Sequence, residues 1–184
     1  IVEQEKLLVK RADIIFASSS VLKEKIKQMG PKQEAELIRN GFKRQNFPEK
    51  TKQLQKGKYN IGYIGTVAEW FDFELLKKSV DRFPDIEYSI WGPFSGGQDS
   101  PLPENIHKMG VLEHERLWEA AEQTDAMIMP FKANPIIEAV DPVKLYEYIN
   151  MGKAVIAPYY NERERFRPYV YFYRDETSLF QLLK

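Results

Sequence analysis

The sequence predicts an α/β protein in which a parallel sheet is covered by helices on both faces. Short apolar runs of strand length, such as residues 59–64 and 86–91, alternate with segments of helical length along most of the chain. Consecutive parallel strands need a long crossover between them, and that crossover is usually a helix lying on a face of the sheet. Such sheets bind ligands beyond the carboxyl ends of their strands, so we expect the functional residues there.

The first 45 residues are predicted to form two helices with a short strand between them. The helices are expected at residues 1–10 and 21–29, the second ended by Gly30-Pro31. The strand is expected at residues 14–17 and leads into three serines, and Asn40-Gly41 is a turn pair further on. Residues 46–58 are polar, lysine-rich and without periodicity, which predicts a linker.

Residues 59–184 are predicted to form one complete domain. Its strands are expected at residues 59–64, 86–91, 106–109, 126–129 and 153–157, with an edge strand at 169–173. Its helices are expected at residues 73–82 (capped by Asp72), 113–123, 142–151 and 178–183.

Composition excludes several classes of protein. The chain has 184 residues, 43% of them hydrophobic, with 27 basic and 27 acidic side chains. A net charge of zero gives no support to nucleic-acid binding. The absence of cysteine fits a reducing compartment and excludes disulfides and thiolate metal sites. No apolar run approaches the ~20 residues that span a bilayer, so we expect a soluble, cytoplasmic protein.

The most informative segment is a helix with well-defined ends. Asp141 is predicted as its N-cap, Pro142 as its first residue and Gly152 as the left-handed residue after its last turn. The free N–H groups that begin such a helix form a site for phosphate. Glu147, about one and a half turns into the helix, can reach a polar ligand group beside it.

The run from Pro142 to Ile156, with Lys144, Glu147 and Gly152, resembles the donor-sugar signature of GT-B glycosyltransferases, in particular the large retaining family four. There the loop and helix hold a nucleotide diphosphate sugar, and the resemblance implies that Glu147 accepts hydrogen bonds from the ribose hydroxyls. Bacterial members that build capsules or cell-wall polysaccharides, teichuronic acid among them, carry a similar run. Further segments match in the family's order, at residues 12–19, 38–42, 61–66, 90–93, 106–112 and 124–131.

The resemblance implies a domain division and a set of donor-binding residues. Residues 59–184 would be the Rossmann-like, nucleotide-sugar-binding C-terminal domain of a two-domain GT-B fold, residues 1–45 a remnant of the N-terminal domain, and 46–58 the linker. The acceptor-binding half would then be missing, so we expect this chain alone to bind donor without transferring sugar. The implied substrate-binding residues are Gly65, Thr66, Gly92, Gly110, Val111, Leu112, Asp141, Pro142, Val143, Lys144 and Glu147.

The sequence departs from the family pattern at two places. Many members carry an arginine and a lysine after the glycine turn of the second domain, whereas residues 67–72 contain no cation here, and Lys144 is the nearest substitute. The family's first glutamate would fall at Ala139. The adjacent Glu138 is therefore assigned as the catalytic carboxylate that contacts the transferred sugar, with Asp141 as another option.

Structural roles compete with these assignments. Glu147 is spaced to form a surface ion pair with Lys144, and Gly65 with Thr66 is equally well explained as a plain strand-to-helix turn. His107 and His114 are expected at the surface. No Asp-x-Asp pair occurs, which argues against the metal-dependent GT-A class of glycosyltransferases, and no metal or other cofactor is expected.

The function expected is transfer of a sugar from a nucleotide diphosphate sugar, with UDP as the nucleotide, to a bacterial polysaccharide or lipid-linked acceptor. Two alternatives stay open: a non-hydrolysing nucleotide-sugar epimerase, and a nucleotide-binding module without catalysis. The expected location is the cytoplasm, and the lysine-rich linker leaves peripheral attachment to the inner face of the membrane as an option.

Overall fold

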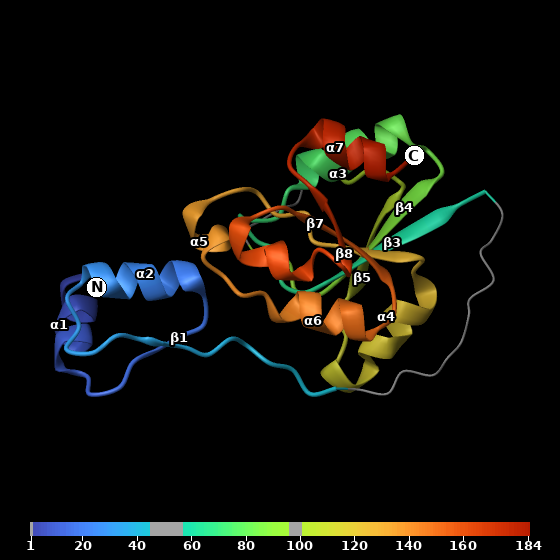
Figure 1. Cartoon of the computed structure of the whole chain (residues 1–184). Helices are drawn as coiled ribbons and strands as arrows, with labels where there is room; N and C mark the ends of the chain where they lie inside the picture. The colour runs from blue at the N-terminus through green and yellow to red at the C-terminus, as the bar shows by residue number, and fades with distance from the viewer. Residues whose placement is uncertain (1, 45–56, 96–100) are drawn as a thin grey trace.

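A six-stranded, all-parallel sheet forms the centre of the molecule (Figure 1). The computed structural model describes residues 2–44, 57–95 and 101–184. The strands lie in the order β5 (Ile106–Gly110), β4 (Ile86–Trp91), β3 (Tyr59–Ile64), β6 (Ala126–Ile128), β7 (Ala154–Pro158), β8 (Val170–Tyr173). The chain builds outward from β3 to β5, then returns to β6 on the other side of β3. This order is the doubly wound one, with its switch point between β3 and β6.

The predicted α/β fold is confirmed, and the strand predictions are close. β3 and β4 have the predicted bounds, and β5 and β8 differ by one residue at one end. β7 is shifted by one residue at both ends, and β6 is one residue shorter than predicted. β8 lies at the edge of the sheet, as predicted. Strands buried on both faces give continuous apolar runs, which is why their bounds could be recognised.

Helices cover both faces of the sheet. Figure 1 shows α3 (Phe73–Arg82) and α7 (Glu176–Leu182) on one face and α4 (Leu117–Gln123) and α6 (Val143–Asn150) on the other. Each face buries its own core, the first around Leu76, Ile90 and Leu179 and the second around Leu145 and Val155. The helix predicted at 113–123 is divided, because its start is the 3₁₀ turn η1 (His114–Arg116).

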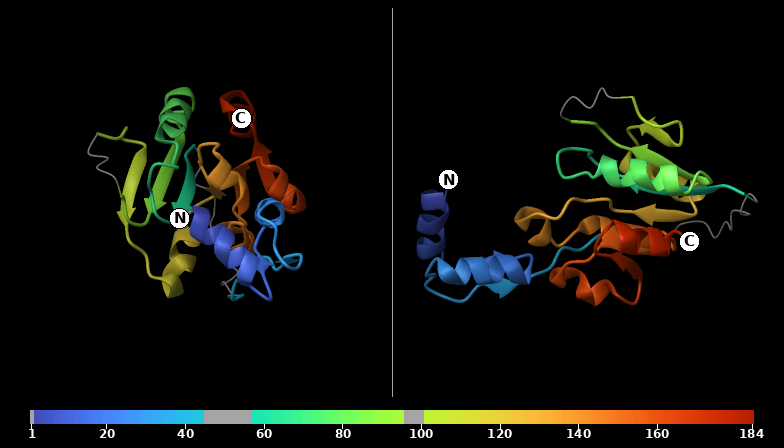
Figure 2. Two further views of the ribbon diagram at one scale, coloured as in Figure 1. Left: turned by 90° about the vertical axis from the view of Figure 1, so that its left-hand side faces the viewer. Right: turned by 90° about the horizontal axis from the view of Figure 1, so that it is seen from above.

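The N-terminal segment forms a small unit beside the sheet (Figure 2). It consists of α1 (Val2–Arg11), α2 (Ser20–Gln28) and a two-stranded parallel ladder of β1 (Phe16–Ala17) with β2 (Glu36–Leu37). The two helices are confirmed. The predicted strand is reduced to two residues, and its partner β2 was not predicted because two residues carry no periodicity.

Two further elements were not predicted from the sequence. α5 (Pro135–Glu138) is a single turn, capped by Asn134 and too short to show a period. η2 (Asn161–Phe166) follows β7 and has the composition of an exposed loop, yet Glu162 and Arg163 within it are buried. Both elements lie on the side of the sheet that faces the N-terminal unit (Figure 1).

The N-cap predicted for α6 is wrong. The helix begins at Val143, and Pro142 takes the cap position without a side-chain hydrogen bond. Asp141 instead accepts hydrogen bonds from the Asn40 N–H, the Tyr146 hydroxyl and the Arg165 guanidinium. Gly152 ends the helix with a φ of 68°, as predicted.

Within the described ranges, no helix is long and apolar enough to cross a membrane. Residues 46–56 of the predicted linker lie outside the described residues.

Candidate functional site

Three glycine turns lie side by side where β3, β4 and β5 end. Gly65 follows β3, Gly92 follows β4 and Gly110 ends β5. The Gly65 N–H donates to the Trp91 carbonyl at 2.8 Å, and the Gly92 N–H donates to the Gly110 carbonyl at 2.8 Å. The structure therefore brings the three predicted glycines together at the carboxyl edge of the sheet, where α/β sheets bind ligands.

The backbones of Gly65 and Gly92 are in contact, which requires a glycine at position 92. A Cβ on Gly92 would lie 2.7 Å from the Gly65 carbonyl carbon, closer than any real side chain approaches. The φ of Gly92 is 132°, a value that residues with a side chain rarely adopt. The packing of the turns thus explains this glycine without a ligand.

Lys144 lies over the Gly65 turn. A Cβ on Gly65 would collide with Cε and Nζ of Lys144 and would lie 3.0 Å from the Tyr63 hydroxyl. The Lys144 Nζ is 6.0 Å from the centre of the Tyr63 ring. Burial lowers the pKa of Lys144, and the Glu147 carboxylate partly opposes that shift. Among the residues that the structure describes, none forms a hydrogen bond or ion pair with this ammonium group.

Tyr148 holds α6 against the end of β3. Its hydroxyl accepts a hydrogen bond from the Ile64 N–H at 2.8 Å and donates one to the Ile64 carbonyl at 3.2 Å. Ile64 is the last residue of β3, and Tyr148 is almost completely buried. Two hydrogen bonds to Ile64 thus hold α6, whose residue Lys144 lies one turn before Tyr148, against the end of β3.

Glu147 is half-buried on α6 and borders a hollow of about 20 Å³ with Phe42, His114 and Met151. In the described part of the chain, no ion pair joins Glu147 to Lys144, so the surface pair considered as an alternative does not form. The carboxylate is therefore available to another partner. Its contact with a ribose stays a prediction.

Asp141 is a docking residue for the segment that precedes the sheet. Its carboxylate accepts a hydrogen bond from the Asn40 N–H at 2.8 Å, and the Asn40 amide donates to the Asp141 carbonyl at 2.7 Å. The guanidinium of Arg165 and the hydroxyl of Tyr146 also donate to this carboxylate. Asp141 is 1% exposed, so its carboxylate is surrounded by these protein partners, and its role in substrate binding stays a prediction.

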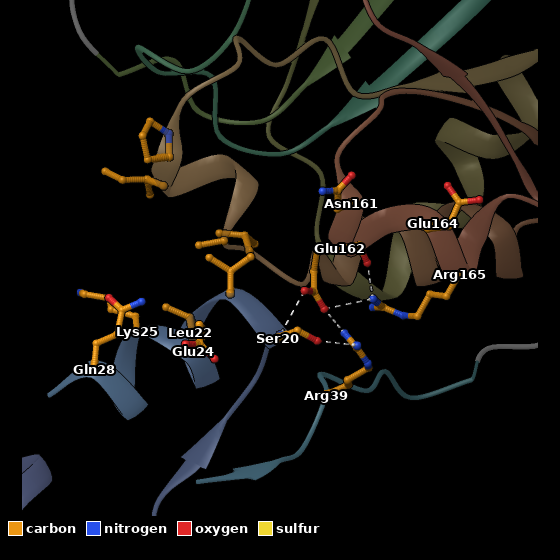
Figure 3. Close-up of a pocket in the computed structure, with 15 residues that line it drawn as sticks. Ser20, Leu22, Glu24, Lys25, Gln28, Arg39, Asn161, Glu162, Glu164 and Arg165 are labelled. Atoms are coloured by element: carbon orange, nitrogen blue, oxygen red, sulfur yellow. Dashed lines mark hydrogen bonds and ion pairs between the residues drawn. The ribbon is translucent and has the colours of Figure 1, made fainter. Parts of the chain in front are cut away.

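Glu162 forms a second link between the N-terminal unit and the domain that contains the six-stranded sheet (Figure 3). Its buried carboxylate accepts from the Ser20 N–H at 3.0 Å and from the guanidinium of Arg39, which also donates to the Ser20 hydroxyl at 3.3 Å. Arg165 donates to the Glu162 carbonyl at 2.6 Å and so connects the two links. Glu and Arg alternate in η2, and this pattern in the sequence fits an exposed surface as well as it fits the buried link that the structure shows.

A cavity of about 1140 Å³ lies between α2 and α5, next to this network (Figure 3). Val21 and Leu22 of α2 face Ile136 and Val140 across it. Ile136 is 77% exposed, so its side chain projects into open space. Sequence patterns do not indicate this cavity, because α5 was not predicted.

Glu138 borders a different cavity, of about 480 Å³. This cavity also contains Lys132 and Tyr160 and the first turns of α3 and α7, which lie on the opposite face of the sheet from α6. Neither Lys144 nor Glu147 lines it. The structure therefore does not gather Glu138 into one cavity with the other predicted site residues, and its catalytic role stays a prediction.

The other predicted residues lie around the same edge of the sheet. Thr66 and Val111 are exposed there, and the Thr66 carbonyl accepts a hydrogen bond from Tyr63 at 2.9 Å. Leu112 is half-buried against the core under α4 and α6. Val143 is 37% exposed at the start of α6. Across the described ranges, no group of three or more metal-ligating side chains is present.

The chain is similar to known glycosyltransferases in sequence and in fold. No protein-family model matches it. It is 27% identical, over 183 residues, to a protein of Bacillus subtilis (strain 168) provisionally named teichuronic acid biosynthesis glycosyltransferase TuaH, and the match covers 92% of this chain and 46% of TuaH. This chain therefore spans about half the length of that relative.

Two solved structures confirm the fold that the family resemblance implied. A mutant of S. aureus TarM, in complex with fondaparinux, α-GlcNAc-glycerol and UDP, superposes with a TM-score of 0.71 at 14% identity, over 98% of this chain and 39% of TarM. The lipopolysaccharide outer core galactosyltransferase WaaB, in its apo form, superposes with a TM-score of 0.62 at 16% identity, over 94% of this chain and 52% of WaaB. The chain has the fold of one portion of these GT-B glycosyltransferases.

The docking role of Asp141 gives a testable prediction. Asparagine is as good an N-cap as aspartate, so Asp141→Asn would be nearly neutral if Asp141 capped α6. We expect instead a loss of about 1.5–3 kcal/mol in the free energy of unfolding, because charge-assisted bonds to Arg165 and Asn40 are lost. Urea unfolding of this variant measures the loss. Asp13→Asn, at a side chain that is 92% exposed, is the matched control. Equal stability of the two variants would contradict the docking role.

Proposed function

We propose that this chain is the donor-binding portion of a glycosyltransferase that takes a sugar from a nucleotide diphosphate sugar. The row of glycine turns beside the start of α6 carries this proposal. The similarity to TuaH and the GT-B fold support it. UDP is the nucleotide proposed, which the presence of UDP in the TarM structure supports.

The geometry suits a diphosphate for electrostatic reasons. The first turn of α6 has N–H groups without intrahelical partners, and the helix dipole makes that end positive. The Gly65 turn lies directly below Lys144 at this end of the helix. As the glycosidic bond to the diphosphate breaks, negative charge grows on the leaving group, and prearranged donors of this kind stabilise it.

Transfer needs more than donor binding. The acceptor hydroxyl must be held against the anomeric carbon, and water must be excluded, or hydrolysis competes. We propose that the acceptor is a bacterial polysaccharide or a lipid-linked sugar, and that its binding and the transfer itself require a protein of the length of TuaH. The retaining course and the role of Glu138 rest on the family resemblance alone, and peripheral attachment to the membrane remains part of the proposal.

Binding of nucleoside diphosphates tests the proposed function. We expect UDP to bind more tightly than GDP or ADP, with heat release in titration calorimetry and an upward shift of the melting temperature, because a ligand that binds only the folded state stabilises it. No heat and no shift with any of the three at millimolar concentration would contradict the proposal.

Turnover of a UDP-sugar without acceptor, by a full-length protein, would favour the epimerase instead. Tight binding without transfer by that protein would favour a nucleotide-binding module.

The ribose contact of Glu147 is tested by Glu147→Gln. Removing the charge should weaken UDP binding by about 1–3 kcal/mol, the cost of losing charge-assisted hydrogen bonds to hydroxyls. The free energy of unfolding should stay the same, because Glu147 has no ion pair with Lys144 to lose. Glu74→Gln, on α3 of the opposite face, is the control. Unchanged UDP affinity in the Glu147 variant would remove the residue from the donor site.

A further inference from the structure

A cavity of about 480 Å³ lies beyond the ends of β7 and β8, beside the first turns of α3 and α7. Pro158 ends β7, Tyr160 follows it, and Tyr173 ends β8. Pockets that bind small ligands have volumes of about 300–1,000 Å³. We propose that this cavity binds a neutral sugar unit, with the Tyr160 hydroxyl as one of its hydrogen-bond partners. This sugar is neither the donor nor the reacting end of the acceptor, so the inference goes beyond the proposed function. Only its assignment to the glycan that the enzyme builds rests on that function.

The Tyr160 hydroxyl is buried and has no hydrogen-bond partner among the residues that the structure describes. The residue is only 8% exposed, and buried polar groups of this kind are nearly always paired. Burial raises the pKa of Tyr160, and the Arg163 guanidinium opposes that shift. The hydroxyl therefore keeps its proton at neutral pH, and it can both donate to a ligand oxygen and accept from a ligand hydroxyl.

Arg163 holds Tyr160 at the wall of the cavity. Its guanidinium lies 4.5 Å from the centre of the Tyr160 ring, and its Nη1 donates to the Pro158 carbonyl at 3.0 Å. Arg163 is 1% exposed, and its Nε and Nη2 also have no hydrogen-bond partner in the described part of the chain. Two neighbouring residues thus carry buried hydrogen-bonding atoms that the protein itself leaves unpaired, next to a cavity of ligand size.

The aromatic lining of the cavity suits a sugar ring. Four aromatic residues line it, namely Phe131, Tyr159, Tyr160 and Tyr173. Aromatic side chains offer large apolar faces, on which the C–H faces of a sugar can pack. The hydroxyls of the same sugar both donate and accept hydrogen bonds, which is what an unpaired tyrosine hydroxyl requires.

Side chains of both charges border the cavity, which favours a ligand without charge. Lys132 and Glu138 both line it, and across the described ranges neither forms an ion pair. Lys78 and Glu176, which also line it, pair with each other at 2.6 Å. An ion of either sign would be repelled by one of the two unpaired side chains. Sugar hydroxyls, in contrast, can accept from the lysine and donate to the carboxylate.

The cavity is separate from the donor site at the Gly65 turn. Neither Lys144 nor Glu147 lines it, and α6 lies on the other face of the sheet (Figure 1). Tyr63 lies against the Gly65 turn, Phe131 lines the cavity, and the centres of these two rings are 6.0 Å apart. Because packed rings lie between the two places, we expect a sugar in the cavity to leave the nucleotide site open.

A packing imperfection is the competing explanation for the unpaired hydroxyl of Tyr160. The hydroxyl would then cost some stability, with no ligand to offset that cost. Both explanations predict that Tyr160→Phe is at least as stable as the unmodified chain, because the hydroxyl has no hydrogen bond to lose. They differ in whether losing this hydroxyl weakens the binding of a sugar.

The test measures binding of the methyl glycosides of glucose, galactose and N-acetylglucosamine by ligand-observed NMR, with and without saturating UDP. We expect at least one of them to bind, equally well in both conditions. Tyr160→Phe should weaken that binding roughly three- to tenfold, the effect of losing one neutral hydrogen bond. Tyr171→Phe, at a tyrosine of β8 that is 58% exposed, is the matched control and should leave the affinity unchanged.

Three results would overturn the inference. They are no binding of any of the three glycosides, equal affinity in Tyr160→Phe, and displacement of the glycoside by UDP or UDP-glucose, which would place the sugar in the donor site. UDP binding tests the proposed function separately, so that function survives each of these results. Thermal unfolding checks that the variant folds. If it does not, Lys132→Met, at an exposed side chain, replaces it: weaker binding of the glycoside supports the inference, and unchanged binding overturns it.

Discussion

All six strands of the sheet run in the same direction, and this constraint collects the candidate site at one edge. Every strand ends on the same side, so the turns after β3, β4 and β5 must meet there, although they are far apart in the sequence. The chain order reverses between β3 and β6, which opens a gap between their following loops. The site therefore follows from how the chain winds, before any side chain is considered.

Close backbone packing then shapes that edge. Gly92 contacts the carbonyl of Gly65, which brings two turns closer than side chains would permit. The same lack of a side chain on Gly65 admits Lys144 from the facing helix. Because Tyr148 ties that helix to Ile64, the helix and the turn are held as one unit, and a ligand would meet groups that are already in place. Preorganisation of this kind reduces the entropic cost of binding.

A network of charges joins the N-terminal unit to the sheet. Arg39 and Asn40 precede the sheet domain in the chain and pair with Glu162 and Asp141, while Arg165 bridges the two carboxylates. Both carboxylates are nearly inaccessible to water, so removing a partner would leave a buried charge uncompensated, which is more costly than losing a surface pair. The cavity between α2 and α5 borders this network, so its shape depends on the same contacts.

The sequence by itself determined the α/β class, the bounds of most strands, the helices on both faces and the row of glycine turns. These features are local, because apolar runs, caps and glycines act on their immediate neighbours. Only the tertiary structure decided the docking roles of Asp141 and Glu162 and placed Lys144 over the Gly65 turn. Asp141 has the local chemistry of an N-cap, but Asn40 and Arg165 compete successfully for its carboxylate. The sequence does not show whether a charged side chain on a helix surface contacts solvent, an ion-pair partner or a ligand. Its partner depends on which distant residues the fold brings beside it.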